Sequence, residues 1–464
     1  MAKHVNDLGR DSVGGLLFRL ALPAIVAQLI NALYNIVDRM YIGHIEGVGD
    51  LALTGLGICF PVLMFISALS ALVGLGGGSR AAIRMGEGRL DLASEILGNC
   101  TALLVLLSAA VTVVFQLWKE PLLYLFGASE NTIGYAVEYL GVYLWGTIAV
   151  LVSLGLNNFI TTQGFSAFSM LTVIIGAVAN IILDPIFIFV FDMGVQGAAL
   201  ATVLSQVLSA VWVLLFLLGR RTRLRLQARY FRLRRAILAP VVAIGVSPFI
   251  MQSTESLVNI ALNSSMRLYG GDPAVGAVTI CSSIMQIFSM PLLGLAQGAQ
   301  PIIGFNYGAG RMDRVRRAYR LLLTCAVAFS CAFWLAVRLF PGAFVALFND
   351  KAELVEITVW ALPIYMGGIF AMGVQNSCQQ TFVALGQAKI SLFLALLRKI
   401  ILLIPLVYLL PRLFGHDQVF FVLLAEPIAD IAAAACTGLT FIRRFPRILN
   451  RRTQQLAAEG GEPS

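Results

Sequence analysis

The sequence "ANIILDPIFIF" occupies residues 179–189, and its residue types pose the main question about the fold. It belongs to an apolar segment at 168–191 that is long enough to cross the ~30 Å hydrocarbon layer of a bilayer as a helix. It nevertheless carries Asn180 and, one turn later, Asp184 followed by Pro185. An ionised carboxylate at the bilayer centre costs about 2.5–3.5 kcal/mol on insertion scales, so Asp184 indicates a protonated acid or a functional site.

Similar apolar segments recur along the whole chain. Of its 464 residues 59% are hydrophobic and 12% are charged, and the mean hydropathy is +0.85. The segments lack the alternation of β-barrel strands, so the sequence predicts an all-α integral membrane protein with about twelve transmembrane helices. We expect these helices near 15–37, 51–77, 96–117, 133–159, 168–191, 195–218, 236–262, 274–304, 318–339, 354–384, 390–410 and 419–441.

Clusters of arginine set the expected orientation. They lie at 80–89, 220–235, 311–320 and 443–452, all on one side of a twelve-helix count. Lys and Arg are retained on the cytoplasmic side of short loops, so we expect a multi-pass protein of the cytoplasmic (inner) membrane with both termini in the cytoplasm. The net charge is +9, and its basic residues lie beside helix ends. At these positions they are expected to contact membrane lipid and to set the orientation of the helices, so they do not indicate a nucleic-acid partner.

The two halves of the chain resemble each other. A shift of 222 residues aligns "GEGRLD" at 86–91 with "GAGRMD" at 308–313, and "IC" at 58–59 with "IC" at 280–281. This agreement indicates an internal duplication. We therefore predict two six-helix lobes related by a pseudo-two-fold axis along the membrane normal. The predicted division is an N-terminal lobe at 1–218, an Arg-rich cytoplasmic linker at 219–235, a C-terminal lobe at 236–445 and a cytoplasmic tail at 446–464.

Polar side chains form stripes within the apolar helices. The first helix carries Gln28, Asn31, Asn35 and Asp38 on one face, and the first helix of the second half carries Gln252, Glu255, Asn259 and Asn263. Further polar residues expected to line a cavity are Asn157, Gln206, Gln375 and Gln379. Such residues either serve transport or tie helices together through hydrogen bonds. For Glu426 and Asp430 both interpretations stay open, because a helix end could bring them near water.

Other motifs predict no cofactor and no enzymatic chemistry. The segment "GLGGGSR" at 74–80 lacks the Gly-Lys-Ser/Thr of a phosphate loop and is typical of close helix packing. The three histidines, His4, His44 and His416, are dispersed and form no predicted metal site. No combination of nucleophile, base and metal is visible.

Several motifs resemble the multidrug and toxic compound extrusion (MATE) family, in its prokaryotic branch. They are "FRLALP" at 18–23, "LYNIVDRMYIGH" at 33–44, "LDPIFIF" at 183–189, "GAALATVLSQ" at 197–206 and "QPIIGFNYGAGR" at 300–311. The resemblance implies two lobes around a V-shaped cavity, a monomer, and export of organic cations in exchange for H+ or Na+. It also implies a cation-coupling cluster of Asp38, Asn180, Asp184 and Thr202, with Na+ at the first three as the alternative to H+.

The second lobe departs in part from the family pattern. Glu255 matches a coupling acid that several relatives carry on helix 7. The stretch 371–380 has only amides where Na+-coupled relatives have an acid on helix 10.

The sequence thus favours a secondary antiporter that exports lipophilic cations, driven by H+. The rival hypothesis is a flippase for lipid-linked precursors, which needs cationic residues in the cavity to meet a pyrophosphate. Arg398 and Lys399 are the candidates for that role, and the sequence leaves their function open.

Overall fold

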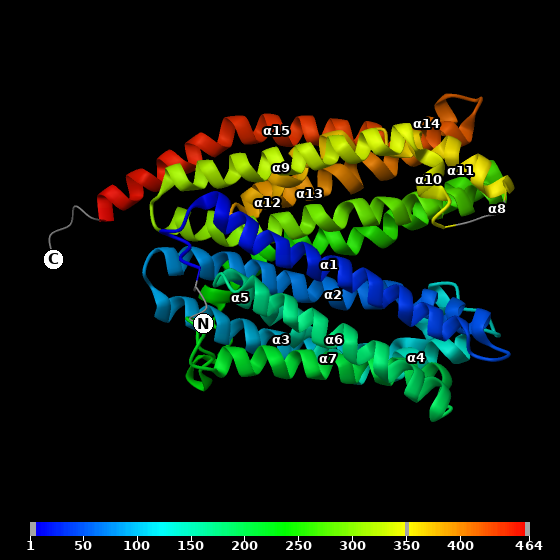
Figure 1. Cartoon of the computed structure of the whole chain (residues 1–464), viewed down its shortest axis with the longest axis horizontal. Helices are drawn as coiled ribbons and strands as arrows, with labels where there is room; N and C mark the ends of the chain where they lie inside the picture. Colours follow the sequence, from blue (N-terminus) through cyan, green and yellow to red (C-terminus); the bar gives the residue numbers. More distant parts are fainter. Residues whose placement is uncertain (1–5, 349–351, 460–464) are drawn as a thin grey trace.

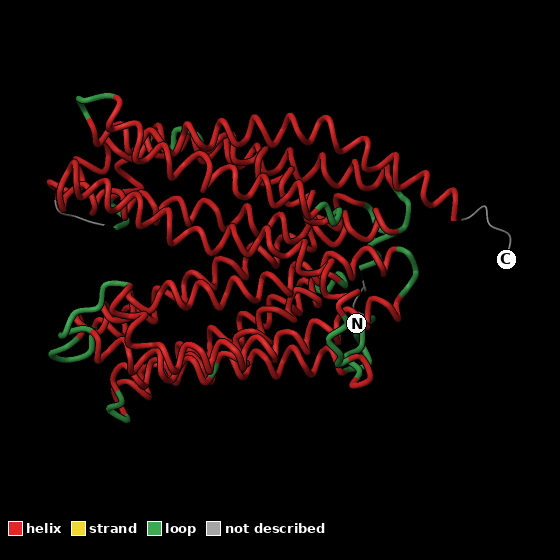
Figure 2. Tube along the Cα trace, turned by 180° about the vertical axis from the view of Figure 1, so that it is seen from behind, coloured by secondary structure: helices red, strands yellow, loops and turns green. Residues whose placement is uncertain are grey.

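The computed structural model describes residues 6–348 and 352–459, and every regular element in these two ranges is a helix. The helices run roughly parallel to one another in two groups, α1–α7 and α8–α15, and most of the loops lie at the two ends of the molecule (Figure 1 and Figure 2). This two-lobed arrangement of membrane-spanning helices confirms the predicted fold class.

The first group contains six membrane-spanning units. They are α1 Val13–Gly43, α2 Gly49–Gly86, α3 Leu90–Leu125, the pair α4 Ile133–Trp145 and α5 Thr147–Thr162, α6 Ser166–Pro185 with the π-helical turn η1 Ile186–Val190, and α7 Gly194–Leu218. A short 3₁₀ turn, η2 Ala228–Tyr230, lies in the segment that leads to the second group.

The second group repeats the plan. Its helices are α8 Arg235–Gly308, α9 Met312–Leu339, α10 Pro341–Val345, the pair α11 Ala352–Tyr365 and α12 Ile369–Ala384, then α13 Ala388–Leu396, the π-helical η3 Leu397–Leu403, α14 Ile404–Leu413, and α15 Gln418–Glu459. A straight α8 of 74 residues would be about 110 Å long. The chain instead reverses at Gly271, which has a positive φ of 67°, so α8 supplies two spans.

Each predicted transmembrane segment coincides with one of these helices or with a bent pair, although 168–191 runs one residue past η1, and several helices extend further than hydropathy indicates. The helix α2 continues to Gly86 where 77 was predicted, and α15 continues to Glu459 where 441 was predicted. The added residues include arginines and other polar residues. Hydropathy marks only the part of a helix that lies in hydrocarbon, whereas the helical backbone continues into the headgroup layer and the water beyond.

The internal repeat is visible in the bends of the helices. The axes of α4 and α5 meet at 58° around Gly146, and those of α11 and α12 meet at 49° just before Ile369. Gly146 and Gly368, which precedes α12, are related by the same shift of 222 residues that aligns the sequence motifs. The duplication therefore preserved the position of a bend as well as the helix order.

The two lobes meet most closely along α2 and α8, where glycines remove the side chains that would separate the helices. A Cβ at Gly308 would collide with the carbonyl oxygen of Ile83, and a Cβ at Gly245 would collide with that of Leu72. Gly74, Gly76, Gly77 and Gly78, within the segment "GLGGGSR", likewise approach neighbouring backbone or side chains. This confirms that the glycine-rich segment serves helix packing.

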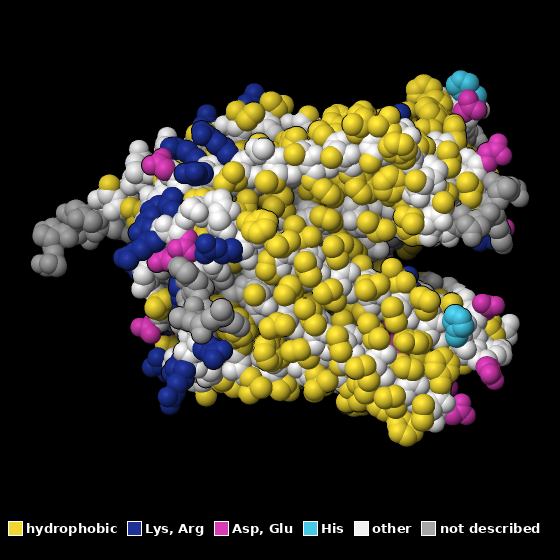
Figure 3. Space-filling model, viewed as in Figure 1, with side chains coloured by type: hydrophobic (Ala, Val, Ile, Leu, Met, Phe, Trp, Pro, Cys, Tyr) yellow, Lys and Arg dark blue, Asp and Glu magenta, His cyan; other side chains and the backbone are white. Residues whose placement is uncertain are grey.

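The lobes separate at the end away from the termini. In Figure 3 the surface is hollowed between them at that end, and Lys and Arg gather at the opposite end, where the termini lie. There Arg452 of α15 contacts Glu87 at 2.6 Å, and Arg84 reaches the same carboxylate at 2.6 Å. The molecule is thus a V that is closed at its basic end.

Candidate functional site

Two carboxyl groups from different helices meet inside the N-terminal lobe. Asp38 lies on α1 and Asp184 lies near the end of α6, and both are buried, with exposed fractions of 8% and 0%. Their carboxyl groups are in direct contact. The polar stripe of the first helix and the acid of the segment at 179–189 therefore converge on one point.

Asn180 and Thr202 complete this cluster. Asn180 Nδ2 donates to Asp184 Oδ1 at 3.1 Å and to Thr202 Oγ1 at 3.4 Å. Asn180 lies one turn before Asp184 on α6, and Thr202 lies on the facing side of α7. The structure thus brings together all four residues that the family resemblance implies for cation coupling. We call them the N-lobe cluster.

Pro185 accounts for the local backbone beside Asp184. Proline cannot donate a backbone hydrogen bond, and the regular helix α6 ends at this residue. The chain continues as the π-helical turn η1, a rare conformation that occurs mostly as single turns, often at functional sites. The regular helix is therefore interrupted directly after Asp184, in the form of a widened turn.

Three oxygens of the N-lobe cluster are buried without a hydrogen-bond partner in the described ranges: Asp38 Oδ1, Asn180 Oδ1 and Asp184 Oδ2. A buried polar atom without a partner is costly. Oxygens from carboxylates and amides are also the ligands that hard cations prefer. A proton between the carboxyl groups would give Asp38 and Asp184 a hydrogen bond, and a small cation such as Na+ would also suit Asn180 Oδ1.

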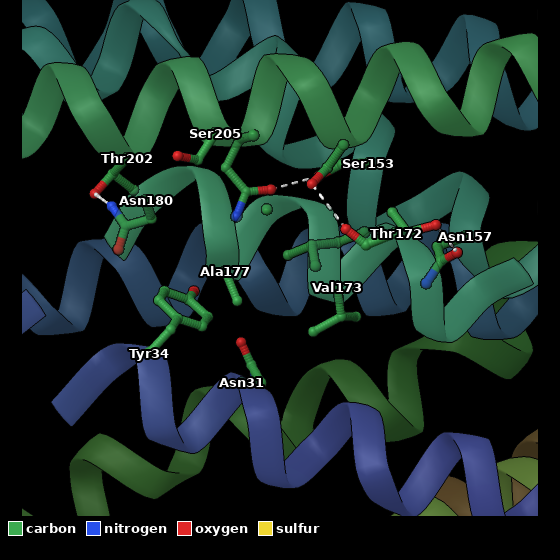
Figure 4. A pocket seen from close by; sticks show the side chains of 14 residues that line it. Asn31, Tyr34, Ser153, Asn157, Thr172, Val173, Ala177, Asn180, Thr202 and Ser205 are labelled. Atoms are coloured by element: carbon green, nitrogen blue, oxygen red, sulfur yellow. Dashed lines mark hydrogen bonds between the residues drawn. The ribbon is translucent and has the colours of Figure 1, made fainter. Parts of the chain in front are cut away.

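A polar cavity of about 440 Å³ adjoins the cluster (Figure 4). Its lining comes from α1, α5, α6 and α7, and consists mainly of amides and hydroxyls. These residues are Asn31, Tyr34, Ser153, Leu154, Asn157, Thr172, Val173, Gly176, Ala177, Asn180, Thr202, Ser205, Gln206 and Ser209. Asn31, Asn157 and Gln206, three of the polar residues singled out in the sequence, are among the residues that line this cavity.

Two tyrosines were not singled out from the sequence. Tyr34 lines the cavity close to Asp38 and Asp184, and the Tyr139 hydroxyl contacts Thr202. Tyr34 lies four residues before Asp38 within "LYNIVDRMYIGH", so helical spacing alone places it on the same face. Tyr139 lies on α4, and only the packing of α4 against α7 brings it to the site.

Gln28 and Asn35 lie outside this cavity. Gln28 Nε2 donates to Gln297 Oε1 of α8 at 3.2 Å, so it joins the two lobes. Asn35 is exposed and donates to the carbonyl oxygen of Asn31 at 2.7 Å.

A second cavity of about 290 Å³ lies between α2, α5 and α8. It is lined by Gly74, Leu75, Gly78, Ser79, Asn158, Thr161, Thr162, Gln297, Gln300 and Pro301.

The C-terminal lobe has a different arrangement of charge. Glu255 of α8 contacts Lys399 of η3, and Lys399 Nζ also donates to the carbonyl oxygen of Met251 at 2.8 Å. Gln252 and Asn259 are half-buried on the same helix, and Asn263 is exposed. Glu255 is therefore already engaged by a cation, which sequence reasoning did not predict.

Arg398, the neighbour of Lys399, binds two acids of α15. Its Nε donates to Asp430 Oδ1 at 2.7 Å, and its Nη2 donates to Glu426 Oε1 at 3.0 Å. Glu426 and Asp430 lie well inside α15 with exposed fractions of 3% and 1%. The possibility that a helix end brings them near water is therefore wrong, because α15 begins at Gln418 and continues to Glu459.

The two predicted lining glutamines of α12 are buried in the C-terminal lobe and line neither of the two cavities. Gln379 Nε2 donates to Ser247 Oγ at 3.0 Å and to the Ser391 carbonyl oxygen at 2.7 Å, which ties α12 to α8 and α13. Gln375 is 8% exposed.

Within the described ranges, no three His, Cys, Asp or Glu side chains come together as a metal site, and His4 lies outside those ranges.

Comparison with known proteins identifies close relatives of this architecture. The MatE family model matches residues 23–186 and 248–409, which is more than half of the chain. The multidrug export protein MepA of Staphylococcus saprophyticus is 23% identical over 427 residues, covering 91% of this chain and 93% of the relative. MepA of Staphylococcus aureus strain MSSA476 is 25% identical over 425 residues, covering 90% and 92%.

Solved structures agree with these sequence matches. A crystal structure described as MATE in the bent conformation superposes with a TM-score of 0.89 at 25% identity, covering 96% of this chain and 98% of the other. An outward-facing multidrug resistance MATE family transporter of the MOP superfamily gives a TM-score of 0.89 at 25% identity, covering 97% and 99%.

Proposed function

Because the chain belongs to the MatE family of transporters, we propose that it is a multidrug efflux antiporter that exports lipophilic organic cations in exchange for H+. The relatives described above are named as multidrug export proteins. The observation that carries the proposal is the contact between two buried carboxyl groups, Asp38 and Asp184, with no basic side chain bonded to either in the described ranges.

The proposed mechanism uses the charge of the N-lobe cluster. When Asp38 and Asp184 are ionised, they attract a cationic substrate into the adjoining polar cavity. When protons arrive from outside, they neutralise the carboxyl groups, and the attraction for the substrate is lost. Asn180 and Thr202 hold Asp184 in position in both states.

Na+ is the alternative coupling ion at Asp38, Asn180 and Asp184. The three unpartnered oxygens of the N-lobe cluster suit a small hard cation in ligand type. H+ is the simpler choice, because a proton shared by two carboxyl groups needs no further ligands. The experiment below separates the two ions.

Membrane placement is part of the proposal. Lys and Arg gather at the end that carries the termini, which favours a cytoplasmic location for that end. The segment 219–235 would then be a cytoplasmic linker between lobes at 1–218 and 236–445, followed by a cytoplasmic tail at 446–464. The V would open to the outside, and the protein would work as a monomer without a cofactor.

The rival flippase hypothesis lacks its cationic site. Arg398 is bonded to Glu426 and Asp430, and Lys399 is bonded to Glu255. Each cation that could meet a pyrophosphate is thus already held by a carboxylate. We therefore do not favour a lipid-linked precursor as the substrate.

The test is uptake of the fluorescent cation ethidium into everted membrane vesicles, with a pH gradient in one arm and a Na+ gradient in the other. We expect the pH gradient to drive ethidium uptake, and we expect a protonophore to abolish this uptake. Uptake driven by Na+ alone would reassign the coupling ion to Na+. Folded protein without uptake in either arm would overturn the proposal. Asp50→Asn, an exposed acid at the start of α2, is the control.

A further inference from the structure

The C-terminal lobe holds a cluster of five ionisable side chains whose charges do not cancel. The basic members are Arg398 and Lys399, adjacent on η3. The acidic members are Glu255 on α8 and Glu426 and Asp430 on α15. With every group ionised, three negative charges face two positive charges, so one negative charge in the lobe is uncompensated.

The position of the excess charge follows from the contacts. Glu255 is paired with Lys399, and 55% of its side chain is exposed. Glu426 and Asp430 share a single guanidinium and are almost completely buried. Burial of an ion without full compensation is expensive at membrane depth. The pair Glu426 and Asp430 therefore has one bonded cation for two buried carboxyl groups, whereas Glu255 has a bonded cation of its own and reaches water.

Two atoms of this pair lack partners. Glu426 Oε2 and Asp430 Oδ2 are buried without a hydrogen bond in the described ranges, whereas the other oxygen of each carboxyl group accepts from Arg398. The remaining neighbours are Lys399 and the hydroxyl of Tyr365 on α11, which contacts Ser282 at 3.5 Å. Lys399 donates to Glu255 and to the Met251 carbonyl oxygen, so neither Glu426 Oε2 nor Asp430 Oδ2 receives a hydrogen bond from it.

We propose that Glu426 and Asp430 together hold one exchangeable proton, which makes the C-terminal lobe a second proton site. A proton on Glu426 Oε2 or Asp430 Oδ2 cancels the excess charge and gives these atoms a donor. A metal cation is disfavoured there because the Arg398 guanidinium occupies the other oxygens of the same carboxyl groups. The site does not depend on the N-lobe cluster, although a role in transport rests on the proposed antiport.

A purely structural role would leave a different signature. The same contacts join η3 to α15, so a loss of stability on substitution would not distinguish the two roles. A structural ion pair keeps its charges fixed over the working pH range, whereas a proton site changes its protonation with pH. The decisive measurement must therefore observe the carboxyl proton itself.

The test is infrared difference spectroscopy of the purified full-length protein between acidic and alkaline buffer, in the Asp38→Asn, Asp184→Asn double variant. This background removes the carboxyl groups of Asp38 and Asp184, so a titrating band does not come from the N-lobe cluster, and the further substitutions separate the C-lobe pair from the other acids. We expect a pH-dependent band of a protonated carboxyl group that is lost on further substitution Glu426→Gln or Asp430→Asn. It should persist in Glu356→Gln, an exposed acid of α11.

The absence of a titrating band in the double variant, or its persistence in both C-lobe variants, would overturn the proposal. If the amide variants fail to fold, the conservative exchanges Glu426→Asp and Asp430→Glu in the double variant keep the test valid, because a band from the exchanged residue must then shift with the other of the two labels, ¹³C-aspartate or ¹³C-glutamate. Normal export by the double variant, with the band retained, would refute the N-lobe coupling role and leave this site intact.

Discussion

The N-terminal lobe buries two carboxyl groups, Asp38 and Asp184, beside an amide and a hydroxyl. The C-terminal lobe buries Glu426 and Asp430 against the guanidinium of Arg398. Both lobes derive from one repeated plan, and each has a π-helical turn beside its buried acids or their basic partner. The repeat thus preserved the order of the helices, whereas the positions of the π-helical turns and the source of compensating charge diverged.

The two lobes differ in the positive charge that neutralises their buried acids. We call it mobile compensation where a proton or another exchangeable cation supplies the charge, and fixed compensation where an arginine side chain supplies it. In the N-terminal lobe we propose that a proton or another mobile cation neutralises the acids, because no Lys or Arg is bonded to them in the described ranges. In the C-terminal lobe Arg398 supplies a permanent positive charge that is bonded to both Glu426 and Asp430. We therefore expect substitutions in the first lobe to affect transport, and substitutions in the second to affect stability.

The largest expected effect is on transport. Asp38→Asn and Asp184→Asn should each reduce ethidium export to the level of cells without the transporter, because an amide cannot exchange a proton. Neither change should prevent folding, since an amide is no more costly to bury than the acid it replaces. Efflux measured at equal expression, with Asp50→Asn as the control, checks this. Wild-type drug resistance in either variant would remove the distinction between the lobes.

The next effect is on stability. Arg398→Met should lower the free energy of unfolding by about 3–5 kcal/mol, because it leaves Glu426 and Asp430 buried without their cation. Thermal unfolding in detergent measures this, with the exposed Arg267→Met as the matched control. Asp184→Asn should change the melting temperature little. Equal losses in Arg398→Met and Arg267→Met would contradict the assignment of fixed compensation.

The smallest effect is expected at the neighbouring ion pair. Lys399→Met should lower the free energy of unfolding less than Arg398→Met does, because the bonded partner Glu255 is 55% exposed and water can solvate it when the pair is lost. The same thermal unfolding experiment compares it directly with Arg398→Met. A loss as large as that of Arg398→Met would mean that Glu255 is part of the buried charge cluster rather than its solvent-exposed edge.

Much of the N-terminal site could be predicted from local patterns. Helical spacing places Asn31, Asn35 and Asp38 on one face, and the same rule applied to Asn180 and Asp184 indicates a second polar face. The convergence of the two faces was expected from the family resemblance, and the packing of α1 against α6 produces it. In contrast, Gln375 and Gln379 have the same residue type as cavity-lining amides, and their burial in the C-terminal lobe depends on how α12 is rotated.

The sequence by itself determined which segments cross the membrane, that they form two similar halves, and which helices carry polar faces. The free energy of transfer from water to hydrocarbon depends on each side chain separately, so hydropathy predicts which segments span the membrane. The helical period then predicts which residues share a face. Only the tertiary structure decided that Arg398 binds both Glu426 and Asp430, and that Lys399 binds Glu255 instead. Such pairings depend on the rotation and approach of helices that are distant in sequence, which the local free energy of transfer does not encode.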